Sequence, residues 1–396
     1  MFEAFEKLPD DPILGLTTAY LNDSNPKKVD LGVGVYRDEQ GKTPVFDAVK
    51  RAERIKLEKE TSKTYTGIEG DPVFNEQIQK LILGADHPSL KDGRSCAIVG
   101  PGGSGSLRVG AEVINSWKPG ANVWVSRPSW PNHIPLIGTA GLTMKEYPYY
   151  DEQAHQIRTD EMLGQISKLG SNDVLLLHAC CHNPTGADLD MNHWKEIARL
   201  AQQNGFTPFV DSAYQGLGRG LDGDAEGLRY LAAAVPEIII AYSCSKNFGL
   251  YRERVGALQI VTKNQTSTEA VRSHMKSVAR RLYSVPPAHG AILVGMILSD
   301  PELKKSWAAE LDGICTRINS LRVQLTDMLA KKGSRQDFSF VRSQYGMFSM
   351  LGLSVEQVQR LKKDYSVYMV NSSRINIAGI SNSNIDYLTD SILAVI

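Results

Sequence analysis

The sequence predicts an α/β protein with a mostly parallel central sheet, followed by a smaller α+β region. Apolar, β-branched-rich runs at 122–126, 174–177, 206–210 and 238–242 each end in polar residues. Strands that are buried on both faces have such continuous apolar runs, and in parallel sheets they alternate with helices. Near residue 300 the pattern changes to a long amphipathic helical stretch at 303–331, followed by shorter strands.

Composition narrows the class of protein. The 396 residues are enough for two or three domains. Lys+Arg and Asp+Glu both number 44, so no net charge attracts nucleic acid or an anionic membrane. The 5 cysteines are an odd number, which argues against a disulfide framework, and no signal-type or membrane-spanning apolar run is present. We therefore expect a cytoplasmic protein that binds neither nucleic acid nor membrane.

The N-terminal third is predicted to be irregular up to a short strand at 29–36. Glycines within that strand allow another group to approach closely. Helical patterns follow at 48–61 and 72–83, with a loop at 63–67 between them. These elements do not identify a chemistry by themselves.

A glycine-rich turn follows the predicted strand at 96–99. Residues 100–105 read Gly-Pro-Gly-Gly-Ser-Gly, and a helix is expected to begin near Ser106. Free backbone N–H groups and the helix dipole favour a phosphate there. The glycines also fit the G-x-G-x-x-G template of nicotinamide dinucleotide sites, but the next strand ends in Arg127-Pro128 instead of an acid. An NADP-linked dehydrogenase and a plain structural turn remain alternatives.

Two polar loops follow the next strands. In the first, the flat face of Trp130 is suited to stack on a ring, although packing beneath its own loop is the structural alternative. In the second, residues 178–182 contain two histidines and two cysteines. Adjacent cysteines do not easily face one tetrahedral metal, and no second ligand pair follows, so no metal is expected. Asn183, before Pro184, is expected to point its amide at a ligand, and the bond between them is a candidate for the cis form.

Asp211 and Lys246 come at or just beyond the ends of two predicted strands. In open α/β sheets ligands bind at the carboxyl edge. A desolvated lysine at that edge has a lowered pKa and can form an imine with a carbonyl compound. A helix N-cap for the acid and a surface position for the lysine are the structural alternatives. One of the following arginines, Arg252 or Arg254, is placed to join the glycine turn around a phosphate.

Three motifs together resemble the class I pyridoxal-phosphate (PLP) aminotransferases, with the aspartate and aromatic-amino-acid enzymes most similar. The motifs are Asn183-Pro184-Thr185-Gly186, Asp211-Ser212-Ala213-Tyr214 and Ser243-Cys244-Ser245-Lys246-Asn247-Phe248-Gly249-Leu250. The resemblance extends from residue 11 to residue 379. It implies the PLP-dependent transferase fold type I, with a large cofactor-binding domain at 47–310. An N-terminal arm and part of the small domain would lie at 1–46, and the rest of the small domain at 311–396.

The resemblance implies a catalytic role for several of these residues. Lys246 would bond to PLP and then move a proton at the substrate Cα. Asp211 would keep the pyridine nitrogen protonated, with His133 supporting the carboxylate from behind. Tyr214 and Asn183 would donate hydrogen bonds to the phenolic oxygen of the cofactor.

The remaining residues are implied to hold the phosphate and the substrate. The phosphate would be bound by Gly103, Ser104, Ser243, Arg254 and, from a second subunit, Tyr65. Trp130 would stack on the ring and, like Asn183, face the substrate. Arg374 would bind the substrate α-carboxylate, with Gly34 closing over it, and Arg280 from the partner would bind a second carboxylate. Residues contributed across subunits imply a homodimer.

The implied reaction is a ping-pong transfer of an amino group to 2-oxoglutarate, and the sequence also bears on the donor. Arg280 favours aspartate and glutamate, although aromatic-accepting members of the family keep this arginine. Ser104 stands where aspartate-specific enzymes have threonine, and Thr64 and Val285 stand where they have asparagine. The loss of two amides makes the pocket more tolerant of an aromatic ring. We expect phenylalanine and tyrosine as donors besides aspartate, with tryptophan a further candidate. A strict aspartate aminotransferase is the alternative.

Overall fold

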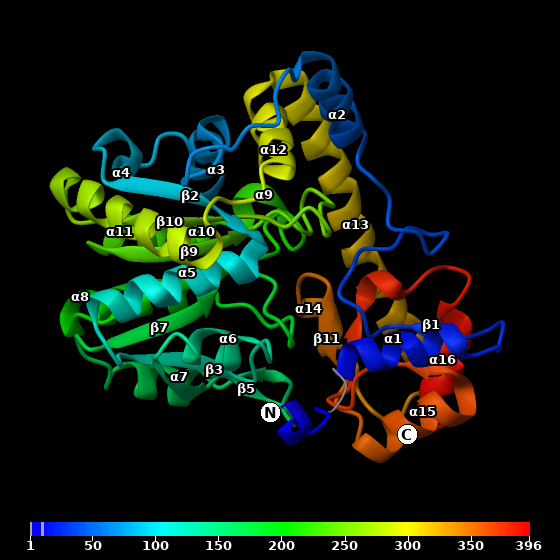
Figure 1. The fold of residues 1–396 in the computed structure, drawn as a ribbon. Coiled ribbons are helices and arrows are strands. Elements are labelled where there is room, and N and C mark those ends of the chain that lie inside the picture. The colour runs from blue at the N-terminus through cyan, green and yellow to red at the C-terminus, as the bar shows by residue number, and fades with distance from the viewer. Residues whose placement is uncertain (1, 9–11) are drawn as a thin grey trace.

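The computed structural model of the protein describes residues 2–8 and 12–396. Its larger part is built around a seven-stranded sheet (Figure 1). Its order is β2-β10-β9-β8-β7-β3-β4, with β10 antiparallel to β2 and β9 and the pairs from β9 to β4 parallel. The strands are β2 (Ser95–Pro101), β3 (Asn122–Arg127), β4 (Thr143–Pro148), β7 (Asp173–His178), β8 (Thr207–Ser212), β9 (Ile238–Ser243) and β10 (Val255–Val261). The predicted α/β fold with a mostly parallel sheet is confirmed.

Helices cover both faces of this sheet because alternate strand side chains enter two separate apolar cores. Phe209 and Ile239 enter one core, whereas Val210 and Ile240 enter the other. The first core is covered by α5 (Gly102–Trp117), α6 (His133–Gly138) and α11 (Gln265–Tyr283). The second is covered by α3 (Pro72–Leu83), α7 (Thr159–Ile166), α8 (Met191–Asn204), α10 (Glu226–Ala234) and α12 (His289–Ser299). Each fully buried aliphatic side chain contributes about 1.5–3 kcal/mol, so the two cores fix the sheet between the helices.

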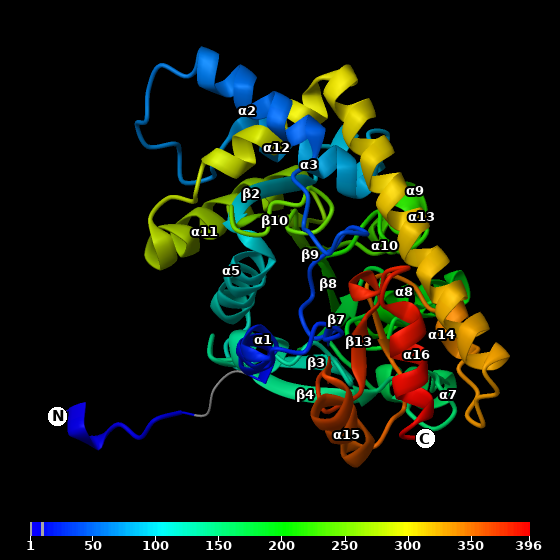
Figure 2. The same cartoon turned by 90° about the vertical axis from the view of Figure 1, so that its right-hand side faces the viewer.

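Segments from the N-terminal and C-terminal parts of the chain pair in a second, smaller unit (Figure 2). Its sheets pair β1 with β12 in parallel and β11 with β13 in antiparallel orientation. We call this the terminal unit, and its elements are α1 (Pro12–Asn22), β1 (Val29–Asp30), α14 (Phe340–Ser343), β11 (Phe348–Met350), α15 (Val355–Tyr365), β12 (Val367–Tyr368), β13 (Arg374–Asn376), η2 (Ile377–Gly379) and α16 (Ile385–Leu393). The arrangement fits the expected division at 1–46, 47–310 and 311–396, whose boundaries stay a prediction.

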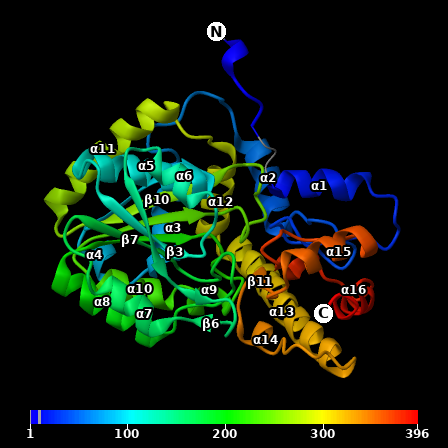
Figure 3. The same ribbon diagram turned by 90° about the horizontal axis from the view of Figure 1, so that it is seen from below.

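One long helix, α13 (Pro301–Lys331), connects the two parts (Figure 3). It packs on α12 and on α2 (Asp47–Lys59) at the sheet and on α14 and α16 in the terminal unit. The remaining short elements are η1 (Phe2–Ala4), α4 (Pro88–Lys91), β5 (Tyr150–Asp151), β6 (Gln156–Ile157) and α9 (Gly220–Gly223). No helix in the part of the chain that the structure describes is both long and apolar enough to cross a membrane.

Two predicted elements differ from the structure. The strand expected at 29–36 ends after Asp30, because the Asn376 side chain, in place of a neighbouring strand, binds the carbonyl groups of Val33 and Val35. The helix expected near Ser106 begins already at Gly102, so the glycines form its first turn. The helix predicted at 72–83 is confirmed, and Asp71 caps it by accepting a hydrogen bond from the backbone N–H of Phe74.

Candidate active site

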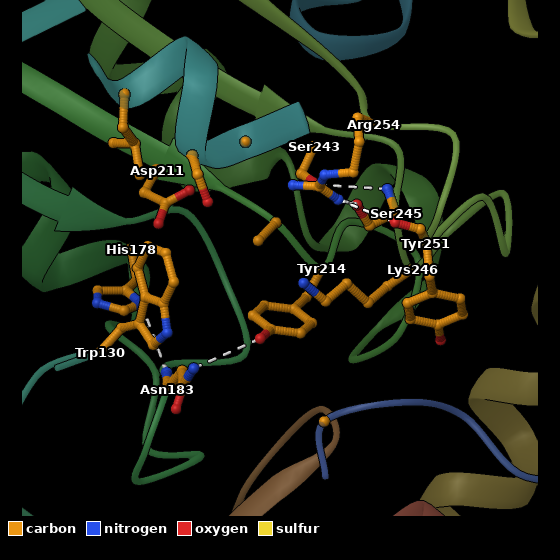
Figure 4. Close-up of a pocket in the computed structure, with 15 residues that line it drawn as sticks. Trp130, His178, Asn183, Asp211, Tyr214, Ser243, Ser245, Lys246, Tyr251 and Arg254 are labelled. Carbon is orange, nitrogen blue, oxygen red and sulfur yellow. Dashed lines mark hydrogen bonds between the residues drawn. The ribbon is translucent and has the colours of Figure 1, made fainter. Parts of the chain in front are cut away.

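A pocket of ≈ 160 Å³ lies at the carboxyl ends of β7, β8 and β9 (Figure 4). Predicted site residues that line it are Gly34, Gly103, Ser104, Trp130, Asn183, Asp211, Tyr214, Ser243, Lys246 and Arg254. Residues that the sequence patterns did not indicate also line it: Leu107, His178, Ala213, Ser245 and Tyr251. Ser245 and Tyr251 flank Lys246 closely in the chain, and that proximity was the available signal. The carboxyl edge therefore gathers most of the predicted residues in one place.

Lys246 reaches this pocket because β9 is buried along its whole length and the chain leaves the sheet just after Ser243. Burial lowers the pKa of Lys246 to about 8, and the positive charge of Arg254 adds to that effect, while the carboxylate of Asp211 opposes it. The ammonium nitrogen lies 5.1 Å from the centre of the Tyr214 ring. An amine with this lowered pKa is neutral in a substantial fraction of molecules near pH 8 and can act as a nucleophile.

Asp211 stands at the end of a chain of hydrogen bonds that runs behind the pocket. Its Oδ2 lies 2.9 Å from Nε2 of His133, and His133 Nδ1 lies 2.9 Å from Oγ of Ser129. Ser129 Oγ lies 3.2 Å from Nε2 of His178, whose Nδ1 accepts the backbone N–H of Asn183 at 3.4 Å. Since His178 Nδ1 accepts, its Nε2 carries the proton, and each following group in turn donates toward Asp211. The chain thus directs His133 Nε2–H at the carboxylate.

The pKa values of these groups fit that arrangement. Burial lowers the pKa of His178 to about 3, so its imidazole is neutral and able to accept. Burial alone would raise the pKa of Asp211, but the hydrogen bond from His133 and the nearby positive charge of Lys246 hold this pKa below its ordinary value. Asp211 is therefore a buried carboxylate that stays charged and is directed at the pocket.

Arg374 approaches the pocket from β13 of the terminal unit. Its Nη1 donates to Asn183 Oδ1 at 3.3 Å, and its Nη2 donates to the carbonyl of Gly32 at 2.8 Å. The guanidinium carbon lies 4.3 Å from the centre of the Phe348 ring, and Asn183 Nδ2 donates to Tyr214 Oη at 3.5 Å. Nε of Arg374 is buried and has no hydrogen-bond partner among the described residues. A buried guanidinium with a free N–H is suited to bind a carboxylate.

The first turn of α5 makes a cradle at another side of the pocket. A Cβ at Gly102 would lie 2.4 Å from Arg254 Nη2, and a Cβ at Gly103 would lie 2.9 Å from the Cβ of Ser243, so only glycines fit. No side chain caps this helix, which leaves its first N–H groups available. Arg254 Nη1 also donates to Ser245 Oγ at 3.3 Å. Backbone N–H groups, hydroxyls and a guanidinium around one spot are suited to bind an anion such as phosphate.

Two predicted site residues lie away from this pocket in the single chain. Tyr65 is 88% exposed in the loop between α2 and α3. Arg280 is exposed near the end of α11, and its Nη1 contacts Ser284 Oγ. His133 and Arg374 do not line the pocket, but they contact Asp211 and Asn183, which do. The roles of Tyr65 and Arg280 stay predictions.

The adjacent cysteines Cys180 and Cys181 lie close to each other and to Asp224. The sulfurs of Cys180 and Cys181 and a carboxylate oxygen of Asp224 all lie within 4.8 Å of one another. However, the Asp224 carboxylate accepts backbone N–H groups from Gly216 and Gly218, and burial raises the pKa of Cys181 well above its ordinary value. A protonated thiol and an occupied carboxylate are poor metal ligands, so we propose no metal here.

Comparison with known proteins identifies the family. The family described as aminotransferase class I and II matches residues 26–392 of the chain. The chain is 45% identical over 396 residues to the aspartate aminotransferase of Escherichia coli K12, covering 100% of both proteins. It is 44% identical over 394 residues to the aromatic-amino-acid aminotransferase of Pseudomonas aeruginosa, covering 100% of this chain and 98% of that protein.

A solved structure agrees with these matches. The crystal structure of the aromatic-amino-acid aminotransferase from Burkholderia pseudomallei, covalently bound to pyridoxal phosphate, superposes with a TM-score of 0.98 at 40% sequence identity. The match covers 100% of this chain and 99% of that one. The chain therefore belongs to the class I and II aminotransferases and has the fold type I architecture of its solved relatives.

Proposed function

We propose that this protein is a PLP-dependent aminotransferase that moves the amino group of phenylalanine, tyrosine or aspartate to 2-oxoglutarate. The observation that carries the proposal is the convergence of Lys246, Asp211 and an anion cradle on one pocket beside Arg374. An NADP-linked dehydrogenase would leave this lysine and aspartate without a function. Relatives named for aspartate and for aromatic amino acids, at 45% and 44% identity, support both classes of donor.

The pocket suits PLP at several separate points. Gly103, which tolerates no side chain, and Arg254 fit the phosphate, while Asp211 is a buried carboxylate able to pair with a protonated ring nitrogen. Lys246 supplies the amine that bonds to the aldehyde. When bound, PLP supplies an electron sink that stabilises negative charge at the substrate Cα. Residues that would hold it are Gly103, Ser104, Trp130, Asn183, Tyr214, Ser243, Lys246 and Arg254, with Asp211 supported by His133.

Within this site each side chain has a separate task. Nζ of Lys246 would remove the proton from the substrate Cα and return it during the transfer, because its lowered pKa lets it both accept and donate a proton near neutral pH. Asp211 keeps its negative charge through the bond from His133. Tyr214 Oη and Asn183 Nδ2, which lie 3.5 Å apart, would donate hydrogen bonds to the phenolic oxygen of PLP, and Arg374 would bind the α-carboxylate of the substrate.

The pKa of Lys246 leads to a prediction about cofactor capture. The neutral amine is the nucleophile, so the rate at which the apoprotein captures PLP should rise with pH up to about 8 and level off above it. Below that value the rate should fall about tenfold per pH unit. Stopped-flow absorbance after mixing apoprotein with PLP measures this rate. A capture rate that stays the same below pH 8 as above it would contradict the assignment of Lys246 as the nucleophile.

We also propose that the active protein is a homodimer with shared sites. Tyr65 and Arg280 are exposed in the single chain, and a partner subunit would place them at the phosphate and at the distal carboxylate of a dicarboxylic substrate. Arg280 would then distinguish aspartate from aromatic donors. The 5 cysteines are all free, which supports a reducing, cytoplasmic location.

Replacing Arg280 tests this assignment. In Arg280→Leu, kcat/KM for aspartate should fall by about 10²-fold or more, because loss of a desolvated charge pair costs about 2–5 kcal/mol. For phenylalanine kcat/KM should change by less than about fivefold, since its side chain has no carboxylate. The neighbouring Arg281→Leu is the control and should affect neither donor. Equal losses for both donors in Arg280→Leu would rule out a role in reading the distal carboxylate.

The proposed donor range is tested by product formation. The protein is incubated with PLP, 2-oxoglutarate and one donor at a time, and phenylpyruvate, 4-hydroxyphenylpyruvate and oxaloacetate are measured. We expect all three, because Thr64 and Val285 remove two amides that would oppose an aromatic ring. Oxaloacetate without either aromatic product would identify a strict aspartate aminotransferase.

A further inference from the structure

Residues 31–37 of the terminal unit, here called the strap, bring Gly34 to the wall of the pocket. The strap is held to its own unit by side chains. Asn376 Nδ2 donates to the carbonyl groups of Val33 and Val35 at 2.7 and 2.8 Å, and Arg374 Nη2 donates to that of Gly32 at 2.8 Å. The strap therefore lies against the arginine proposed to bind the substrate α-carboxylate.

Across the pocket, the strap is bound by Tyr251. The backbone N–H of Tyr36 donates to Tyr251 Oη at 2.9 Å, although the two residues are 215 positions apart. Tyr251 lines the pocket in the segment that follows Lys246 (Figure 4). Its own carbonyl accepts from Arg254 Nη1 at 2.9 Å. This single hydroxyl thus joins the strap to the segment that holds the proposed phosphate arginine.

The strap has little freedom on its other side. A Cβ at Gly34 would lie 2.8 Å from Cζ of Phe348, so the strap already touches that ring and cannot move further toward it. Tyr36 is buried, with 8% of its surface exposed. If the Tyr251 hydroxyl were absent, the Tyr36 N–H would lose the partner that the structure gives it and could regain one only by moving toward water.

We propose that Tyr251 is a positioning residue for substrate binding, whose hydroxyl fixes the strap so that Gly34 lies over the substrate beside Arg374. This inference rests on the proposed function. Tyr251 acts through the strap, and the strap contacts Arg374 through Gly32. Loss of the hydroxyl should therefore weaken binding of every amino-acid donor, because all of them share the α-carboxylate, and should change the proton transfer at Lys246 much less.

The test is Tyr251→Phe, which removes one oxygen and keeps the ring. We expect KM for phenylalanine and for aspartate to rise about tenfold, the usual effect of orphaning one buried hydrogen-bonding group. kcat should stay within about twofold, and the absorbance of bound PLP should not change. The control is Tyr147→Phe, since Tyr147 is buried, donates to the Leu176 carbonyl at 3.1 Å and does not line the pocket.

A second measurement does not depend on turnover. Hydrogen exchange of the apoprotein, followed by NMR or mass spectrometry, should show the Tyr36 amide exchanging at least about tenfold faster in Tyr251→Phe and unchanged in Tyr147→Phe. Unchanged exchange, a fall in kcat with constant KM, or the same KM rise in both variants would each overturn the proposal. If the wild-type protein transfers no amino group, the proposed function fails, and the exchange result still decides whether the hydroxyl fixes the strap.

Discussion

Lys246→Ala is expected to lower kcat/KM for every amino donor by at least about 10⁴-fold. The substitution removes both the amine that bonds to the cofactor and the base that moves the substrate proton. No other lysine lines the pocket among the described residues, so no neighbour can replace it. The loss should appear in single-turnover rates with phenylalanine and with aspartate, measured on protein saturated with PLP.

Two further variants distinguish the loss of the reactive amine from the loss of the positive charge. Lys246→Arg keeps a positive charge but cannot act as a nucleophile or base near neutral pH, so it should be as inactive as the alanine variant. Lys145→Ala, at a lysine that lies over the Trp124 ring and does not line the pocket, should keep normal activity. If Lys246→Ala retained even about one hundredth of the wild-type rate, Lys246 could not be the essential base.

Asp211→Asn is expected to lower kcat by about 10²-fold or more, since leaving one partner of a buried charge pair alone costs about 3–5 kcal/mol. The amide keeps the shape of the carboxylate and can still accept from His133, but it carries no charge to hold the ring nitrogen of PLP protonated. Asp211→Glu, which keeps the charge, should recover part of the loss. Steady-state kcat and the absorbance of the bound cofactor at several pH values measure the effect. Equal kcat for Asp211→Asn and wild type would exclude this role.

The positions of Lys246 and Asp211 could be predicted from sequence because both depend on local rules. Each comes at or shortly after the end of a continuous apolar strand, and the carboxyl ends of such strands meet at one edge of a parallel sheet. The glycine turn at Gly102–Gly103 was likewise visible as a backbone that admits no side chain. Only the start of its helix was misplaced.

The rest of the site depends on contacts between distant parts of the chain, which no local pattern reveals. Arg374 reaches Asn183 because β13, which carries it, pairs with β11, and because β1 from the N-terminal part of the chain pairs with β12. The chain of hydrogen bonds through Ser129 and His178 requires side chains from the loop after β3, from α6 and from the end of β7 to meet behind the pocket. The prediction of a strand at 29–36 was wrong beyond Asp30 for the same reason. The side chain of Asn376, more than 300 residues away in sequence, binds the carbonyl groups of Val33 and Val35.

The central claim is that Lys246 holds PLP and that the bound cofactor accepts amino groups from aromatic and acidic donors. The most direct measurement is an absorbance scan of the purified, PLP-supplied protein in the near-ultraviolet and visible range. Separate samples receive phenylalanine and aspartate. A band of lysine-bound cofactor that disappears with either donor, with appearance of the pyridoxamine form, is the predicted result. Absence of any bound-cofactor band after PLP is supplied would contradict the account.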